Sequence, residues 1–129
     1  MPTVGQTYTA NDYSKEFKCS TRSGMNYSKT TKSMVIITKE NTTEHGDYWK
    51  GNVLHYTGQG AIGDQKLSRA NKRLANANAE GTSLHIYSLV GPKQYIYRGE
   101  AELVKCYTEK QLDIAGNSRT VYKFELKLK

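Results

Sequence analysis

The stretch HYTGQGAIGDQKLSRANKRL, residues 55–74, joins the end of an expected strand to a basic helix through a glycine-rich turn. The strand covers residues 52–57. We expect Asp64 to cap the helix, which would run for about four turns and end near Gly81. The apolar residues of this helix recur at steps of three and four and form one face: Leu67, Ala70, Leu74 and Ala77.

The segments on either side are predicted to be mostly strands. Further strands are expected at residues 33–38, 83–90, 93–108 and 119–129. The first is apolar enough to be buried on both faces, the third should bend near Gly99, and the last alternates, so that one face is exposed to water. Residues 11–17 are expected to form a short helix capped by Asn11, and residues 22–32 an exposed basic loop. These elements predict an α+β fold, with a curved, barrel-like antiparallel sheet and one central helix in a single domain over residues 1–129.

The charge of the chain indicates the class of partner. The chain has 129 residues, with 19 Lys and Arg against 12 Asp and Glu, so its formal net charge is +7. A basic small domain is typical of proteins that bind a polyanion, most often nucleic acid. Ten tyrosines add rings that can stack on bases, although we expect most of them to be structural.

The sequence lacks the patterns of disulfide-rich, zinc-binding, membrane and secreted proteins. Cys19 and Cys106 are too few and too far apart for a disulfide framework or a zinc site, so we expect two reduced thiols. No segment is long and apolar enough to span a membrane, and the first ten residues lack the pattern of a secretion signal. We therefore expect a cytoplasmic protein with no membrane partner.

The glycine turn does not fit the two common phosphate-binding loops. A triphosphate site needs Gly-Lys-Ser/Thr at the end of the loop, whereas here Asp64 would repel the phosphates. The letters of GxGxxG are present in residues 58–63, but the later strands are expected to be antiparallel, so the βαβ unit of a dinucleotide site is missing. Both kinds of nucleotide site are excluded.

Catalytic motifs are weak in this sequence. Glu125 and Lys127 have the Glu-x-Lys spacing of some metal-dependent nucleases and share one face of a strand, with Asp113 upstream as a further ligand. The same spacing is common in any half-exposed strand. The three histidines have no metal-ligand spacing, and no serine or cysteine lies in a nucleophile motif. We expect no catalytic residues, no metal and no cofactor, and a small metal-dependent nuclease is the enzyme alternative.

Three motifs in the central stretch together resemble the SRA domain, also called the YDG domain. They are Tyr-Thr-Gly-x-Gly at residues 56–60, Asp-Gln-x-Leu at residues 64–67, and Asn-x-x-Leu at residues 71–74, where Arg73 replaces a small residue. The apolar strand and Gly-Asn pair upstream fit the same family, so the match covers roughly residues 22–105. SRA domains read modified cytosine in DNA, and they occur in chromatin regulators and in bacterial modification-dependent restriction enzymes.

The resemblance implies a PUA-like barrel that flips the modified base out of the duplex into a pocket. In this chain Tyr56 would stack on the base, Thr57 would lie beside the 5-substituent, and Asp47 would accept a hydrogen bond from the exocyclic amine of cytosine. The family position of a second ring holds Glu44, so Tyr48 or Trp49 would have to take this role. The expected pocket residues are Asp47, Tyr48, Trp49, Tyr56, Thr57 and Gly58.

Only residues 61–63 separate the first two motifs, where eukaryotic members of the family have a long insertion that enters the duplex. The short form resembles the bacterial restriction-enzyme branch. Another loop would have to fill the gap left by a flipped base, and we expect Met25, Asn26 and Tyr27 of the basic loop to insert into the duplex. The residues expected to contact DNA phosphates are Lys29, Lys32, Lys66, Arg69, Lys72 and Arg73.

The sequence thus predicts a recognition domain for double-stranded DNA that contains 5-methylcytosine or 5-hydroxymethylcytosine. It is expected to be fused to or associated with a nuclease domain, as part of a longer bacterial restriction enzyme. Two binding alternatives stand beside this interpretation. One is a DNA-binding module that reads sequence or shape without flipping a base, and the other is an RNA-binding module of PUA type.

Overall fold

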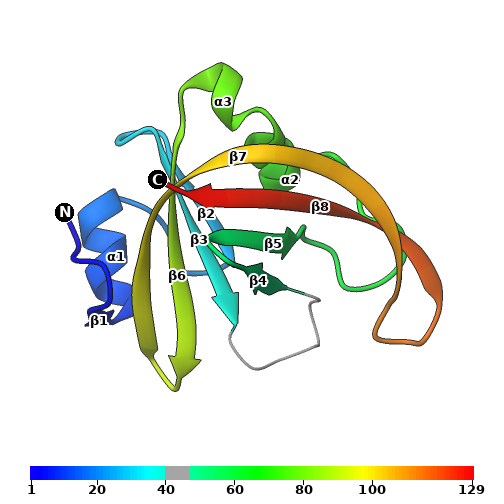
Figure 1. Cartoon of the computed structure of the whole chain (residues 1–129), viewed down its shortest axis with the longest axis horizontal. Coiled ribbons are helices and arrows are strands. Elements are labelled where there is room, and N and C mark those ends of the chain that lie inside the picture. Colours follow the sequence, from blue (N-terminus) through cyan, green and yellow to red (C-terminus); the bar gives the residue numbers. More distant parts are fainter. Residues whose placement is uncertain (40–46) are drawn as a thin grey trace.

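The computed structural model describes residues 1–39 and 47–129, and Figure 1 shows its elements. In chain order they are β1 (Thr7–Tyr8), α1 (Ala10–Phe17), β2 (Met25–Ser28), β3 (Ser33–Lys39), β4 (Tyr48–Lys50), β5 (Val53–Thr57), α2 (Arg69–Ala75), α3 (Ala77–Glu80), β6 (Ser83–Gly91), β7 (Gln94–Leu112) and β8 (Ser118–Leu128). Within the described residues, one sheet has the order β2-β3-β6-β7-β8-β5-β4, with β1 paired to β7. Most of the regular secondary structure is strand, as predicted.

The sheet is curved but not closed. β2 and β4 stand at its two ends, and no pairing joins them in the part of the chain that the structure describes. β3 and β6 run parallel, from the pair Ser33↔Ser83 to the pair Lys39↔Leu89. The prediction of an antiparallel sheet is wrong at this pair. The long connection through β4, β5 and two helices returns the chain to the start of β3, so β6 begins beside it and runs the same way.

β7 and β8 form a long hairpin that carries one wall of the candidate site. Their pairing extends from Ala101↔Leu128 to Leu112↔Ser118, whereas β5 pairs with β8 only as far as Thr57↔Lys123. The hairpin therefore projects beyond β5 as a curved arm (Figure 1). The predicted bend in β7 coincides with Gly99, which has a φ of +128° beside a register shift in the pairing with β6. Glycine adopts this backbone region without the steric cost of a Cβ atom.

Two hydrophobic clusters lie on opposite faces of β3. The main cluster includes Met34, Ile36, Leu54, Leu74, Ile86, Phe124 and Leu126. The second cluster lies under α1 and consists of Tyr13, Phe17, Val35, Tyr87 and Tyr97. Full burial of one such side chain stabilises the fold by about 1.5–3 kcal/mol. The prediction that residues 33–38 are buried on both faces is confirmed, because alternate residues of β3 enter alternate clusters.

The predicted central helix is shorter than expected and is broken, since α2 and α3 stand in its place. Asp64 does not cap a helix: its Oδ1 accepts a hydrogen bond from the Thr120 N–H at 2.7 Å. The Gln65 N–H donates to the Thr120 C=O at 2.8 Å. These two bonds hold the chain against β8, so it cannot enter a helix there, and Leu67 is exposed rather than part of an apolar face.

The first helix is close to its prediction. α1 begins at Ala10, and its N-cap is Thr9 rather than Asn11. Thr9 and Asp12 form a capping box, in which each side chain accepts a hydrogen bond from the other residue's backbone N–H. Among the described residues, no helix has the length and apolar composition needed to cross a bilayer.

Residues 22–32 do not form the exposed loop that their polarity predicts. β2 lies within this segment and pairs with β3, and the side chains of Met25 and Asn26 are buried. Met25 belongs to the main cluster, and Asn26 donates to the Ser23 C=O at 2.6 Å. Tyr27 is half-buried beneath Arg73, whose guanidinium carbon lies 3.9 Å from the ring centroid. The prediction that Met25, Asn26 and Tyr27 form a duplex-inserting loop is therefore wrong, because all three are held by packing and pairing in the sheet.

We expect the fold to lose stability at alkaline pH through its buried tyrosines. Burial raises the pKa of Tyr13 and of Tyr97 from 10.0 to about 12. Because the folded protein favours the neutral phenol, their contribution to stability is complete below pH 10 and is lost as the pH rises towards 12. Urea unfolding at pH about 8 and about 11 measures this loss, which should be smaller in Tyr13→Phe. An equal loss in this variant and the wild type would contradict the assignment.

Candidate nucleic-acid interface

A cavity of about 750 Å³ lies beside the Tyr-Thr-Gly strand. Its walls come from the segment before β2, the ends of β3 and β5, the glycine loop (residues 58–65) and the tip of the β7–β8 hairpin. The lining residues are Tyr13, Thr21, Arg22, Ser23, Gly24, Ile37, Lys39, Asp47, Tyr56, Thr57, Gly58, Gln59, Gly60, Ala61, Leu89, Tyr95, Leu112, Asp113, Ile114 and Arg119. Segments far apart in sequence thus meet around one hollow. Four of the six residues predicted for the pocket lie in its wall: Asp47, Tyr56, Thr57 and Gly58.

The Asp47 carboxylate is fixed in this wall by two hydrogen bonds. Its Oδ1 accepts from the Thr57 N–H at 2.8 Å, and its Oδ2 accepts from the Thr38 hydroxyl at 3.1 Å. The first bond joins the start of β4 to the end of β5, and the second joins it to β3. The carboxylate is therefore held in one place before any ligand arrives, which is the preorganisation that hydrogen-bond recognition requires.

Tyr56 is anchored at its hydroxyl. The phenol donates towards the Gly24 C=O at 3.2 Å and the Ile37 C=O at 3.3 Å. Burial, reinforced by the nearby Asp47, raises the pKa of Tyr56 well above its ordinary value of 10.0, so the phenol is neutral. The side chain spans from β5 to the β2–β3 edge of the cavity, and these bonds fix the position of its hydroxyl.

Lys123 is buried, although the sequence predicts it on the exposed face of its strand. The alternation of β8 predicts it on the exposed face, yet its side chain is only 1% exposed. Its Nζ donates to the Thr57 Oγ1 at 2.7 Å and lies 5.6 Å from the centroid of the Tyr48 ring. Burial lowers the pKa of Lys123, and the carboxylates of Glu109 and Asp47 oppose this shift. The lysine thus fixes the side chain of Thr57 from behind the cavity wall.

The glycine loop is held by two buried amide side chains. Gln65 donates to the Gly58 C=O at 2.6 Å and to the Gly60 C=O at 3.1 Å, and its Oε1 accepts from the Tyr122 N–H at 2.9 Å. Asn71 donates to the Gln59 C=O at 3.1 Å and accepts from the Gln59 N–H at 2.8 Å. These contacts explain the motif: a Cβ atom at Gly58 would lie 2.7 Å from the Asn71 Oδ1, so only glycine fits.

The hairpin tip is tied to the same loop. Asp113 accepts from the N–H groups of Gly63 at 3.1 Å, Ala115 at 3.0 Å and Asn117 at 2.9 Å. These backbone bonds, led by that from Asn117, lower the pKa of Asp113. From β8, the buried Arg119 donates to the carbonyls of Gly60 and Gly63. The turn of the hairpin and the glycine loop therefore form one connected structure.

The aromatic residues of the cavity differ from those predicted. Neither Tyr48 nor Trp49 lies in its wall: the Tyr48 ring stacks on His55 with centroids 4.5 Å apart, and Trp49 packs against the main cluster. Tyr13 and Tyr95 line the cavity instead, as an edge-on pair with centroids 5.3 Å apart. Sequence reasoning missed both, because α1 and β7 are distant in sequence from the motif and carry no local signal. Glu44 lies outside the described residues.

The predicted phosphate contacts fall into two groups. Lys29 and Lys32 lie at the β2–β3 turn, the opposite end of that hairpin from Gly24 at the cavity. The other exposed cations lie on α2 or just before it: Lys66, Arg69, Lys72 and Arg73. Asn71 joins this segment to the glycine loop. The sequence did not single out the three cations that line the cavity, which are Arg22, Lys39 and Arg119.

The residues proposed for a nuclease do not come together as a site. Asp113 is bonded to backbone N–H groups at the hairpin tip, whereas Glu125 pairs with His55 and Lys105 in the middle of the sheet. Among the described residues, no three His, Cys, Asp or Glu side chains are grouped so as to hold a metal ion.

A family model for the ScoMcrA-like SRA domain matches residues 4–128 of the chain. The chain belongs to the ScoMcrA-like SRA domain family. The resemblance inferred from the motifs is confirmed, and the SRA domain extends over nearly the whole chain rather than over residues 22–105. No curated protein matches the chain.

Solved SRA structures share the fold of this SRA domain. The sulfur binding domain and SRA domain of ScoMcrA, complexed with phosphorothioated DNA, matches with a TM-score of 0.77 at 19% identity, over 99% of this chain and 40% of that one. The SUVH5 SRA domain in complex with hemi-methylated CG DNA matches with a TM-score of 0.75 at 22% identity, over 99% and 89%. SUVH5 SRA bound to fully hydroxymethylated CG DNA matches with a TM-score of 0.73 at 22% identity, over 98% of this chain and 88% of that one. This SRA domain covers 28% of the chain of the phosphorothioation-dependent restriction endonuclease ScoMcrA.

We expect Asn71→Asp to destabilise this SRA domain by about 2–3 kcal/mol. The change preserves the shape of the side chain but replaces the donors to Gln59 and Lys66 with a carboxylate oxygen that faces two carbonyl oxygens. Urea unfolding measures the loss. Asn76→Asp is the matched control, because Asn76 is exposed between α2 and α3 and its side chain makes no capping hydrogen bond. Equal stability of the two variants would contradict the role given to Asn71.

Proposed function

We propose that this SRA domain binds double-stranded DNA at a modified cytosine and receives the modified base, flipped out of the duplex, in the cavity. The observation that carries the proposal is the fixed Asp47 carboxylate beside Thr57 in the cavity wall. A carboxylate accepts a hydrogen bond from the exocyclic amine of cytosine and repels the carbonyl that thymine has at that position. The solved SUVH5 SRA complexes with methylated and hydroxymethylated CG DNA support this class of ligand.

The tyrosines of the cavity supply the stacking surface that a flipped base needs. Flipping costs a few kcal/mol of lost stacking and pairing, and an aromatic side chain returns about 1–3 kcal/mol per stacked base. Tyr56, anchored at its hydroxyl, remains the proposed stacking ring. Tyr95 replaces Tyr48 and Trp49 as the proposed second ring, because it lines the cavity and has the most exposed side chain of the three tyrosines there.

Thr57 is the proposed contact for the 5-substituent of the base. Its hydroxyl oxygen accepts from Lys123 behind the wall, so the side chain presents a constant surface to the cavity. One methyl group in a fitted pocket discriminates by about 1–3 kcal/mol. The volume of about 750 Å³ also leaves space for a hydroxymethyl group or a larger substituent.

The exposed cations would bind the DNA backbone around the cavity. Arg22 and Lys39 lie in its wall, and Lys66 and Arg69 border the glycine loop. Neutralised phosphates release counterions, so we expect binding to weaken steeply with salt. A module that reads DNA sequence or shape without flipping would show the same salt dependence but would not need Asp47.

We infer that the domain is the recognition part of a longer modification-dependent restriction enzyme that acts in the bacterial cytoplasm. ScoMcrA supports this inference, since a domain of this family makes up only part of that endonuclease. The cleavage activity would then belong to a fused or associated nuclease domain.

A binding titration at fixed salt tests the proposed function. Matched duplexes carry cytosine, 5-methylcytosine or 5-hydroxymethylcytosine at one position. We expect the wild type to bind one modified duplex about tenfold or more tightly than the plain one, and Asp47→Asn to lose this preference. Glu102→Gln on the exposed face of β7 is the control, because it changes the net charge equally and lies outside the cavity.

The two outcomes separate the proposed function from its alternative. A preference that Asp47→Asn loses and Glu102→Gln keeps supports the flipped-base cavity. Equal binding of all three duplexes by the wild type, unchanged in both variants, would contradict the proposal and favour a basic DNA-binding module. Tighter binding to RNA competitor than to duplex DNA would favour the RNA-binding alternative.

A further inference from the structure

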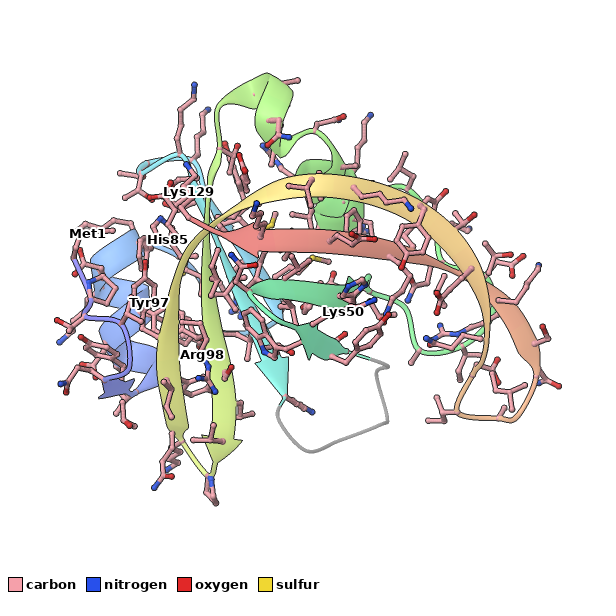
Figure 2. All side chains as sticks on the ribbon, in the orientation of Figure 1. Met1, Lys50, His85, Tyr97, Arg98 and Lys129 are labelled. Carbon is pink, nitrogen blue, oxygen red and sulfur yellow. The ribbon has the colours of Figure 1, made fainter. Side chains whose placement is uncertain are left out.

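His85 is a buried histidine that the proposed function does not use. Its side chain is 3% exposed and lies on β6 beside α1 (Figure 2). Both ring nitrogens have a partner, since Nδ1 lies 2.9 Å from the Tyr97 hydroxyl and Nε2 lies 3.2 Å from the Ser83 Oγ. Burial raises the pKa of Tyr97 to about 12 and also raises that of Tyr87 on the same strand, so both phenols are neutral. His85 therefore lies in a polar but uncharged environment.

The hydroxyl groups around His85 determine which nitrogen carries the hydrogen. The Ser33 hydroxyl donates to the Thr31 C=O at 3.1 Å, so the Ser83 hydroxyl donates to the Ser33 Oγ, 2.9 Å away. The Ser83 Oγ then accepts from Nε2–H, and Nδ1 accepts from the Tyr97 phenol. An imidazolium has a hydrogen on both nitrogens, so the phenol would have to turn its own hydrogen away from Nδ1. The contacts thus fit the neutral ring.

The charged groups near His85 are already paired with other groups. The Glu100 carboxylate on β7 lies 2.9 Å from the Lys129 Nζ, and the Glu16 carboxylate on α1 lies 3.5 Å from the Met1 amine. The two carboxylates favour a charged His85 and Lys129 opposes it. Burial outweighs the carboxylates and lowers the pKa of His85 from its ordinary value of 6.5.

α1 contacts both His85 and the cavity through two aromatic side chains one turn apart. The Phe17 ring centroid lies 4.3 Å from that of His85. Tyr13 lines the cavity and packs edge-on against Tyr95, with centroids 5.3 Å apart. A helix of eight residues is unstable by itself in water, so α1 persists only while it is docked on the sheet. Docking on His85 and completion of the cavity wall are therefore one event.

We propose that His85 is a positioning residue for base binding, which seats α1 through Phe17 so that Tyr13 and Tyr95 complete the cavity wall. A proton on His85 places a charge in a buried site and breaks the bond from the Tyr97 phenol, so α1 leaves the sheet more often. This inference rests on the proposed function, because the cavity is the site expected to receive the flipped base.

The sign of the pH dependence follows from the lowered pKa of His85. The undocked state has the ordinary pKa of 6.5 and binds the proton more readily than the docked state does. Docking is therefore complete above pH 6.5 and is weakened progressively as the pH falls below this value. The affinity for the modified base falls with the fraction of molecules in which α1 is docked.

The first experiment uses the wild-type protein without DNA. Protection factors of backbone amides against hydrogen exchange measure how often a segment opens. We expect those of α1 to fall about threefold or more between pH about 7 and about 5.5, while those of β8 stay constant. Constant protection of α1 would overturn the proposal. An equal fall in α1 and β8 would also overturn it, because the whole fold would then be opening.

The second experiment links His85 to the cavity. The probes are the plain duplex and the modified duplex that the wild type prefers, and their affinity ratio cancels the general effect of pH on phosphate binding. We expect the wild-type ratio to fall about threefold or more between pH about 7.5 and about 5.5, and the ratio of His85→Asn to be the same at both. The Asn amide is neutral throughout and still offers a hydrogen-bond donor and an acceptor. His55→Asn is the matched control and should follow the wild type, because His55 is half-buried and lies outside the cavity.

The outcomes separate this inference from the proposed function. A wild-type ratio that does not change with pH would contradict the role of His85, and so would an equal fall in His85→Asn, which would assign the pH dependence to another group. A wild type that binds all duplexes equally would remove the proposed function. The protection factors would still decide whether His85 seats α1, and they need no variant to fold.

Discussion

Two buried amide side chains, Gln65 and Asn71, hold the backbone of the glycine loop against the ends of β5 and β8. Their donors and acceptors bond to the peptide groups of residues 58–60, which lie outside the hydrogen-bonding ladder of the sheet beyond Gly58. A buried amide side chain without partners costs about 1–3 kcal/mol, so the two buried amides favour the one loop path that satisfies them. That path places Gly58 in the cavity wall and leaves Gly63 within reach of Asp113 on the hairpin. The cavity, its rim and the position of α2 all follow from this arrangement.

The sequence predicts the elements whose signal is local. The strand at 33–38 has a continuous apolar run, and the bend near Gly99 has a glycine where the backbone takes a positive φ. The motif at 56–60 identifies the family, because its glycine requirement and its amide partners are close together in the chain. The roles given to Asp47 and Thr57 stay predictions, although both residues lie in one cavity wall.

The errors arise where distant contacts override the local pattern. Asp64 is predicted to cap a helix, but its carboxylate instead accepts a hydrogen bond from the backbone N–H of Thr120, more than fifty residues later. Met25 lies in a polar segment, yet its backbone pairs with the edge of β3 and its side chain packs in the main cluster. Lys123 alternates like an exposed residue, but Thr57 and the ring of Tyr48 cover that part of β8. Tyr95 reaches the cavity through the folding of β7, which no pattern near the motif reports.

The crystal structure of the chain bound to a duplex with one modified cytosine tests the central claim most directly. We predict that the modified base lies in the cavity, with its exocyclic amine within hydrogen-bond distance of the Asp47 carboxylate and its 5-substituent beside Thr57. A bound duplex in which that base stays stacked between its neighbours, with the cavity outside the interface, would contradict the claim.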